Sequence, residues 1–507
     1  MTGTTTTTTH DRTRWLALMV LCLGGLMIVL DVTIVNVALP SIRASLGFTQ
    51  SSLAWVVNGY MLTFGGFLLL GGRLGDLYGH RRLFLIGLTL FTVASLCCGL
   101  AGSQAFLIAA RLVQGLGGAT VSAVSLSLMM SLFVEEGERA KAMGVFGFVN
   151  AGGGTMGVLL GGVLTDVLSW HWIFLVNLPI GLAVFLLSLR LLPAGGPRPA
   201  ERRPLDVGGA VLVTAALMLA VYAIVNGNRA GWTSAQTLGL LGGGGVLLAA
   251  FVAVEARTPA PLMPLGLFKL RNLSSANVVG VLWAGAMFAW FFLSALYLQL
   301  VLGYSPLEVG LGFLPATLIM GAFSLGLSAK LVMRLGLRIP VSAGLALAAG
   351  GLALFVRAPV GGDYLVDVLP SMVLLGVGAG MAFNPILLAA MGDVQPGESG
   401  LASGIVNTSF MMGGGLGLAV LASVAASRTS ALAAAGQGHA SALVGGYHVA
   451  FGIGALFALV AGILGGALLR TRGPMAAGAG APAHGSQAHP AHDPAVPVAA
   501  LADVAEG

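Results

Sequence analysis

The sequence predicts an all-α polytopic membrane protein that crosses the bilayer fourteen times, and two observations carry this prediction. Of the 507 residues, 57% are apolar and only 8% are charged, whereas about a quarter of a soluble domain is charged. The apolar residues also form stretches of roughly 18 to 28 residues along the whole chain, each long enough to span about 30 Å of hydrocarbon as a helix. The composition therefore indicates a chain embedded in a lipid bilayer along its length.

The predicted spans are separated by short loops. They cover residues 15–39, 52–71, 83–102, 105–133, 141–167, 172–192, 207–226, 237–254, 275–302, 309–332, 339–356, 366–390, 402–426 and 447–469. A re-entrant pair is the alternative for the seventh and eighth spans, but their flanking charges favour two crossings.

The basic residues orient these spans. With the N-terminus in the cytoplasm, 19 of the 24 lysines and arginines fall on the inner side, which obeys the positive-inside rule. We therefore expect both termini to be cytoplasmic. The net charge of +6 follows from the same rule and implies no nucleic-acid partner.

A basic, proline-rich segment, PAGGPRPAERRP (193–204), divides the chain. The divisions that we expect are a disordered cytoplasmic N-tail (1–14), an N-terminal six-helix bundle (15–192), a cytoplasmic linker (193–206), an inserted two-helix segment with a cytoplasmic loop (207–271), a C-terminal six-helix bundle (272–470) and a disordered cytoplasmic C-tail (471–507).

The loop GRLGDLYGHRR (72–82) has an echo in AKLVMRLGLR (329–338). Aligning Gly79 with Gly336 also pairs Arg81 with Arg338. Two parallel repeats related by an axis along the membrane normal would produce this echo.

One acid lies inside the first span and one base inside the fourth. Asp31 lies about 13 Å, and Arg111 about 10 Å, inward from the outer ends of their helices at 1.5 Å per residue. An ionised aspartate near the membrane centre costs about 2.5–3.5 kcal/mol, so we expect both side chains to face one interior cavity. Burial favours the neutral acid, while a nearby arginine favours the carboxylate. A change in water access would then make Asp31 take up or release a proton; the alternative is a static ion pair.

The loop after the second span carries Gly72, Arg73, Asp76, Gly79 and Arg81. Its glycines suit a tight turn and close helix approach, and Asp76 could hold a helix N-terminus or a basic partner. We interpret this loop as a conformational latch; a solvated turn is the alternative.

Glycines also crowd the fifth span, as Gly153, Gly154, Gly157, Gly161 and Gly162. Small residues at such spacing permit close helix packing. They could also make a flexible seam between the two halves.

Five side chains of the ninth span share one helical face: Trp283, Met287, Trp290, Ser294 and Tyr297. An aromatic and thioether stripe with little charge would suit flat, apolar ligands, although core packing or lipid contact would explain it equally well. Asn384, next to Pro385, favours a kink that lines the same substrate cavity.

Several kinds of site have no sequence signal. The three lysines follow Ala, Phe and Ala, so none belongs to a P-loop, and we expect no use of ATP. No spacing of ligating residues indicates a metal, and no motif indicates a cofactor or an enzyme. A gradient-driven carrier is the simplest use of this architecture.

Four motifs occur in order: LDVTIVNVALP (30–40), GRLGDLYGHRR (72–82), RLVQGLGGA (111–119) and WHWIFLVNLPIG (170–181). Together, over roughly residues 15–470, they resemble the fourteen-helix drug:proton antiporter family of the major facilitator superfamily. The resemblance implies the major facilitator fold, with two six-helix bundles that alternate access and an inserted helix pair. It also implies proton-driven export of lipophilic compounds, with Asp31 and Arg111 as coupling residues and Asp76 as the gating acid.

Two positions depart from the family pattern. Val158 stands where the fifth-span motif normally has proline, and Phe410 stands where relatives often have arginine. Relatives that export divalent cations use additional acids, so we expect hydrophobic, neutral or monocationic substrates.

We therefore expect a proton-coupled antiporter that exports a lipophilic small molecule as a monomer. The excess of arginine over lysine, 21 to 3, indicates a GC-rich bacterial genome and hence a bacterial plasma membrane. The alternatives are a dedicated exporter of one self-made natural product, an importer or sugar facilitator, and a non-transporting membrane sensor. Sodium is an alternative coupling ion.

Overall fold

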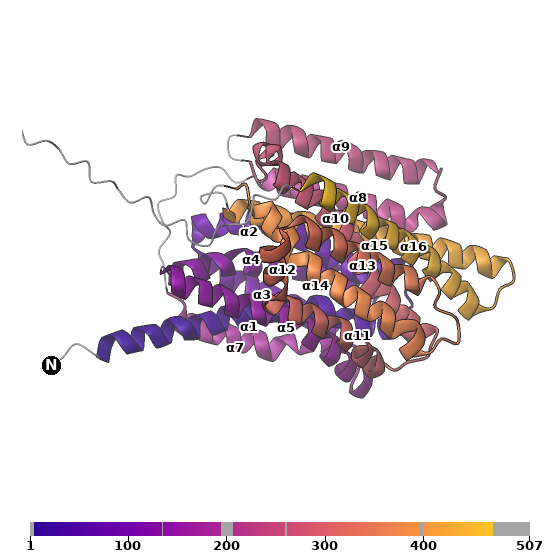
Figure 1. Cartoon of the computed structure of the whole chain (residues 1–507), viewed down its shortest axis with the longest axis horizontal. Helices are drawn as coiled ribbons and strands as arrows, with labels where there is room; N and C mark the ends of the chain where they lie inside the picture. Colours follow the sequence, from indigo (N-terminus) through magenta and orange to yellow (C-terminus); the bar gives the residue numbers. More distant parts are fainter. Residues whose placement is uncertain (1–4, 134, 194–205, 259–260, 395–398, 470–507) are drawn as a thin grey trace, which may run out of the picture.

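The computed structural model describes residues 5–133, 135–193, 206–258, 261–394 and 399–469, and its regular elements there are all helices. The long helices lie side by side in one bundle (Figure 1). The prediction of an all-α chain is confirmed for these residues. The linker at 194–205 and the C-tail from residue 470 onward lie outside the described residues.

The first half of the chain contains seven α-helices and a short 3-10 helix. They are α1 (Thr5–Leu46), η1 (Ser52–Ala54), α2 (Trp55–Tyr78), α3 (His80–Gly99), α4 (Gln104–Leu132), α5 (Glu136–Val167), α6 (Trp172–Leu175) and α7 (Asn177–Leu191). The inserted segment supplies α8 (Val207–Ala230), α9 (Ala235–Arg257) and the 3-10 helix η2 (Leu265–Lys269).

The second half has the same succession of long helices. It comprises α10 (Arg271–Leu300), α11 (Pro306–Ala322), the π-helix η3 (Phe323–Leu327), α12 (Ser328–Leu335), α13 (Arg338–Phe355), the π-helix η4 (Tyr364–Val368), α14 (Leu369–Met391), α15 (Ser399–Ala434) and α16 (His439–Leu468).

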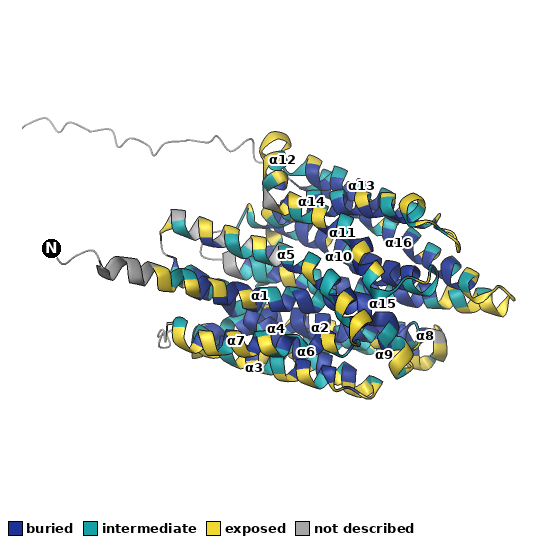
Figure 2. Cartoon of the chain, turned by 90° about the horizontal axis from the view of Figure 1, so that it is seen from below, coloured by how far each residue is buried: buried dark blue, intermediate teal, exposed yellow. Residues whose placement is uncertain are grey.

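Length and apolar composition make this a multi-pass membrane protein. Among the described residues, 12 helices are long and apolar enough to cross a bilayer, and α11 is a shorter apolar helix. The remaining two of the fourteen predicted spans correspond to α5 and α11, so the exact count stays a prediction. Exposed residues lie on the outside of the bundle and buried residues fill its interior (Figure 2), and many of the exposed residues are large and apolar.

The two halves pack their helices alike. In the first half α1 packs on α5 and α4 packs on α3; in the second, α10 packs on α15 and α14 packs on α13. The halves meet along α5 with α11 and along α2 with α15. Within the inserted pair, α8 packs on α2 and α15, whereas α9 packs on α8 and lies at the edge of the molecule (Figure 1).

Two elements differ from their sequence prediction. The first helix begins at Thr5, inside the segment that we expected to be disordered. The span predicted at 309–332 is broken by the π-helix, where Gly326 has a φ of 126° that other residues rarely adopt.

Candidate functional site

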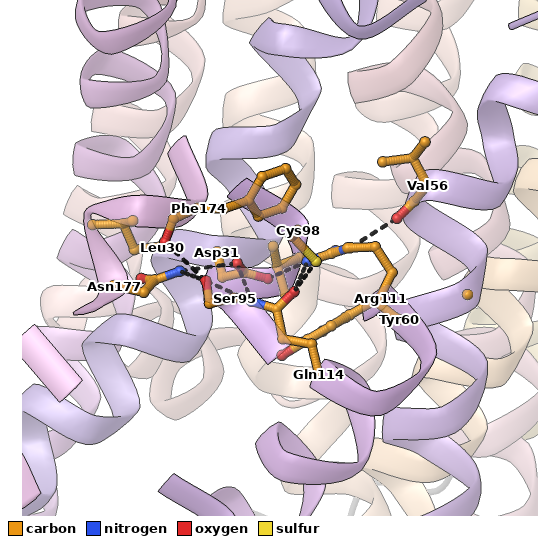
Figure 3. A network of polar contacts seen from close by, with 12 residues as sticks. Leu30, Asp31, Val56, Tyr60, Ser95, Cys98, Arg111, Gln114, Phe174 and Asn177 are labelled. Atoms are coloured by element: carbon orange, nitrogen blue, oxygen red, sulfur yellow. Dashed lines mark hydrogen bonds and ion pairs between the residues drawn. The ribbon is translucent and has the colours of Figure 1, made fainter. Parts of the chain in front are cut away.

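The acid of the first span is completely buried and carries three hydrogen bonds from side chains. Asp31 Oδ2 accepts from Arg111 Nη1 at 2.5 Å. Its other oxygen, Oδ1, accepts from Gln114 Nε2 at 2.8 Å and from Asn177 Nδ2 at 3.1 Å. Figure 3 shows these donors arriving from α4 and α7 around the α1 carboxylate.

Arg111 is as deeply buried as its partner. Its Nε donates to the Val56 carbonyl at 2.9 Å and its Nη1 also donates to Gln114 Oε1 at 2.7 Å. The guanidinium lies 4.4 Å from the centre of the Tyr60 ring and 5.6 Å from that of Phe174. Ring faces at such distances stabilise a cation that has lost its water.

Ser95 of α3 closes the network on its far side. Its hydroxyl accepts from Asn177 Nδ2 at 3.0 Å and from Gln114 Nε2 at 3.2 Å, and donates to the Phe174 carbonyl at 2.9 Å. The site is thus a buried charge pair whose remaining hydrogen-bonding capacity is largely met by neutral polar groups, as charges in a low-dielectric interior require.

The network lies within one half of the protein. The sequence placed Asp31 and Arg111 in one interior cavity, and the structure does bring the two side chains together. The pair is enclosed by α1, α2, α3, α4, α6 and α7 of the first half, and Asp31 is 0% exposed. The reason is that each charge turns toward its polar partners on neighbouring helices of its own half.

The loop echo is present as a structural repeat. Gly79 (φ 93°) ends α2 and Gly336 (φ 72°) ends α12, both in a conformation that favours glycine. Two residues on, Arg81 donates to the Leu189 carbonyl near the end of α7 at 2.5 Å, and Arg338 donates to a carbonyl at the end of α16. Each arginine therefore caps the last helix of its own half.

Close helix contacts fix how the two halves correspond residue by residue. In the first half Gly117 of α4 lies against Phe91 of α3, and in the second half Gly378 of α14 lies against Ala348 of α13. In the same way, Gly161 of α5 lies against Ile34 of α1, and Gly417 of α15 lies against Gly285 of α10. Phe91 and Ala348 are separated by the same number of residues as Arg81 and Arg338. The turns before α3 and α13 and these two helices therefore align in one register.

This register shows that the polar network exists in one half only. The positions of Asp31, Arg111, Gln114 and Ser95 are taken in the second half by Leu282, Met372, Leu375 and Leu352. Three of these apolar side chains are buried and Leu282 is partly buried. The same helix packing is thus reached without a charge, so the fold itself does not require the Asp31 network.

The predicted latch is only partly described. Only Gly79 lies at the α2–α3 turn, because α2 continues through Gly72 and Arg73 to Tyr78. Arg73 is half-buried, and Arg81 makes the contact given above. The side chain of Asp76 lies outside the described residues, so its gating role stays a prediction.

The predicted glycines of α5 face two different neighbours. Gly153, Gly157 and Gly161 lie against α1, whereas a carbon added to Gly162 would lie 2.7 Å from the first carbonyl oxygen of α11, in the other half. Among the described residues, no heavy atom of another helix lies within 4 Å of the corresponding point at Gly154. The glycines therefore pack α5 on α1 and, at Gly162, let the two halves touch.

The aromatic stripe of the ninth predicted span lies on α10. Trp283, Trp290, Ser294 and Tyr297 are buried, and Met287 is half-buried. Tyr297 donates to the Pro359 carbonyl at 2.7 Å, which ties α10 to the loop between α13 and η4. Asn384 is half-buried on α14, which continues through Pro385. A role of these residues in binding substrate stays a prediction.

Three members of the network were not singled out from the sequence. Gln114 stands one helical turn after Arg111, and Asn177 is the only amide in the fourth quoted motif, so both had a weak signal. Ser95 had no sequence signal, because the side chain of a serine in an apolar helix commonly hydrogen-bonds to the backbone of its own helix.

The fold and this site define a multi-pass membrane protein built from two similar helical halves. The Major Facilitator Superfamily profile matches residues 21–418, and the chain belongs to that superfamily. An auto-inhibited peptide transporter of the POT family shares the fold, with a TM-score of 0.61 and 17% identity over 89% of this chain and 96% of that one.

Relatives of higher identity are also transporters or resistance proteins. The cephamycin export protein CmcT of Amycolatopsis lactamdurans is 42% identical over 83% of this chain and 87% of its own length. The puromycin resistance protein pur8 of Streptomyces alboniger is 38% identical over 91% and 92%. The multidrug resistance protein Stp of Mycobacterium tuberculosis is 39% identical over 83% and 78%.

Proposed function

We propose that this protein is a proton-coupled secondary antiporter that exports hydrophobic, neutral or monocationic antibiotics or drugs by alternating access. The single observation that carries the proposal is the buried Asp31–Arg111 pair, which occupies positions that the other half fills with apolar side chains. A charge pair that the fold does not need is expected to serve the reaction. The antibiotic export and resistance functions named for the relatives support the choice of cargo.

In the proposed cycle, the described conformation holds Asp31 as a carboxylate closed off from water. Rearrangement of the first half opens a path from the outside, a proton binds Asp31, and the ion pair with Arg111 is lost. Arg111 keeps two acceptors, the Val56 carbonyl and Gln114 Oε1, so its charge is not left without partners. On the inner side the proton leaves and the ion pair forms again.

The driving force of such a cycle can be estimated. One proton falling through about 100 mV contributes about 2.3 kcal/mol. Because about 1.4 kcal/mol corresponds to a factor of ten, one proton sustains a substrate gradient of roughly 50-fold.

The proposal includes the finer architecture expected from the sequence. We place fourteen crossings, two six-helix bundles with an inserted pair, and both termini on the cytoplasmic side of a bacterial plasma membrane. The protein acts as a monomer, without ATP.

The test compares two carboxyl-to-amide variants in inverted membrane vesicles. Asp31→Asn is expected to abolish drug accumulation driven by a pH gradient while the protein stays folded. Glu308→Gln, which alters an exposed acid at the start of α11, is the matched control and is expected to transport normally. Undiminished uphill transport by Asp31→Asn would refute the proposal.

A dedicated exporter of one self-made natural product is the second candidate. The observation that favours it is the 42% identity to a cephamycin export protein, which exceeds the 39% to a multidrug resistance protein. A panel of chemically unrelated dyes and antibiotics separates the two, since a dedicated exporter lowers the accumulation of one compound class only.

A further inference from the structure

The hydrogen bonds at Asp31 are complete for a carboxylate and incomplete for a carboxylic acid. An ionised carboxylate only accepts hydrogen bonds, and all three groups that reach Asp31 donate to it. A protonated Asp31 carries an O–H that must find an acceptor in a buried site. The proposed function requires this neutral state, so the structure must offer an acceptor somewhere in the network.

Most neighbours cannot accept the new hydrogen. Arg111 has donors only. Gln114 Oε1 already accepts from Arg111 at 2.7 Å and from the Cys98 thiol at 3.6 Å. The Ser95 hydroxyl already accepts from two amides and donates to a carbonyl.

Among the described residues near the pair, Tyr60 Oη and Asn177 Oδ1 are buried acceptors without a partner, and of these two residues only Asn177 already bonds to Asp31. Its Nδ2 donates to Asp31 and to Ser95, but its Oδ1 is buried and has no hydrogen-bond partner in the described part of the chain. A buried acceptor without a partner is destabilising, so it is not expected without a reason. In Figure 3 the Asn177 amide lies beside both Asp31 and Ser95.

We propose that Asn177 is the positioning residue that serves both protonation states of Asp31, by turning its amide between donor and acceptor. This inference rests on the proposed function. With Asp31 ionised, Nδ2 donates to the carboxylate, as described. When a proton binds Oδ1 of Asp31, the amide turns over, and the new O–H donates to Asn177 Oδ1. No other covalent bond changes, and the proton returns to water when the cycle reverses.

The backbone suits this role. Asn177 is the first residue of α7, directly after the break that separates α6 from α7. The terminal torsion of an asparagine side chain is broad and nearly two-fold, so the turn needs no movement of α7. In the turned state Ser95 loses the hydrogen bond from Asn177 Nδ2 and keeps the one from Gln114 Nε2.

The test uses infrared difference spectra of the purified protein between neutral and acidic buffer. The carbonyl stretching band of protonated Asp31 is identified by its loss in Asp31→Asn. In the wild type we expect the band of a hydrogen-bonded acid. In Asn177→Leu, which neither donates nor accepts, we expect the band to move to the higher frequency of a free acid and uphill transport to fall at least tenfold.

Two further variants make the test specific. Asn36→Leu removes another buried asparagine of the first half, whose amide bonds only its own helix, and is expected to leave the band in place. Asn177→Ser keeps a group that both donates and accepts; it is expected to restore a hydrogen-bonded band, and it replaces the leucine variant should that variant not fold. A wild-type band in Asn177→Leu would overturn the inference alone, whereas uphill transport by Asp31→Asn would overturn the proposed function.

Discussion

Removing one charge of the buried pair is expected to have the opposite effect on stability to replacing both charges and Gln114 by apolar residues. The first variant is Asp31→Leu alone. The second combines Asp31→Leu, Arg111→Met and Gln114→Leu, which gives the first half the apolar residues of the equivalent positions in the second. Because the second half packs its helices in the same register with these residues, the triple variant has a precedent within this chain.

The expected changes in the free energy of unfolding follow from the burial of the two charges. Arg111 is 1% exposed, and in the single variant it loses the carboxylate at 2.5 Å. Breaking a buried ion pair by removing one partner costs about 3–5 kcal/mol, because the other charge stays buried. Replacing the whole pair by apolar groups ranges from neutral to a gain of about 1–4 kcal/mol. The triple variant is therefore expected to be more stable than the single variant by about 3 kcal/mol or more.

The assay is equilibrium unfolding of the purified variants in the same detergent, together with drug uptake into inverted vesicles. The triple variant is expected to unfold at or above the wild-type midpoint, and neither variant is expected to transport uphill. Equal stability of the single and triple variants would refute the reasoning that the second charge is costly on its own. Uphill transport by the triple variant would refute the functional role of the network.

Two smaller predictions concern helix contacts. Gly162→Ala places a carbon 2.7 Å from the α11 backbone and is expected to cost about 1–3 kcal/mol, whereas Gly154→Ala, which meets no neighbour within 4 Å, is expected to be neutral or stabilising; thermal unfolding in detergent compares them. A carbon added to Gly209 would lie 2.5 Å from Asp206 Oδ2 and 3.0 Å from Glu255 Oε1, so these two buried carboxylate oxygens lie near each other. Glu255→Gln supplies an N–H donor there and is expected to raise stability by about 0.5–1.5 kcal/mol; an unchanged or lower unfolding midpoint would contradict this.

The sequence by itself determined the helices and the two charges that matter. Long apolar runs make helices wherever they lie in a bilayer, because the backbone must satisfy its hydrogen bonds within each segment. Asp31 and Arg111 could be recognised in the same way, since a charge inside an apolar span is costly wherever its helix packs. Such properties are local, and a single sequence contains them.

Only the tertiary structure decided which groups surround those charges. Whether Asp31 faces a cavity or faces Arg111, Gln114 and Asn177 depends on the rotation of three helices about their axes. Each rotation is set by contacts between residues far apart in the chain. The apolar counterparts in the second half became visible for the same reason, because only glycine contacts between helices fixed the register of the two halves. The length of a span is encoded in one segment, whereas the partners of a side chain are encoded in all of them together.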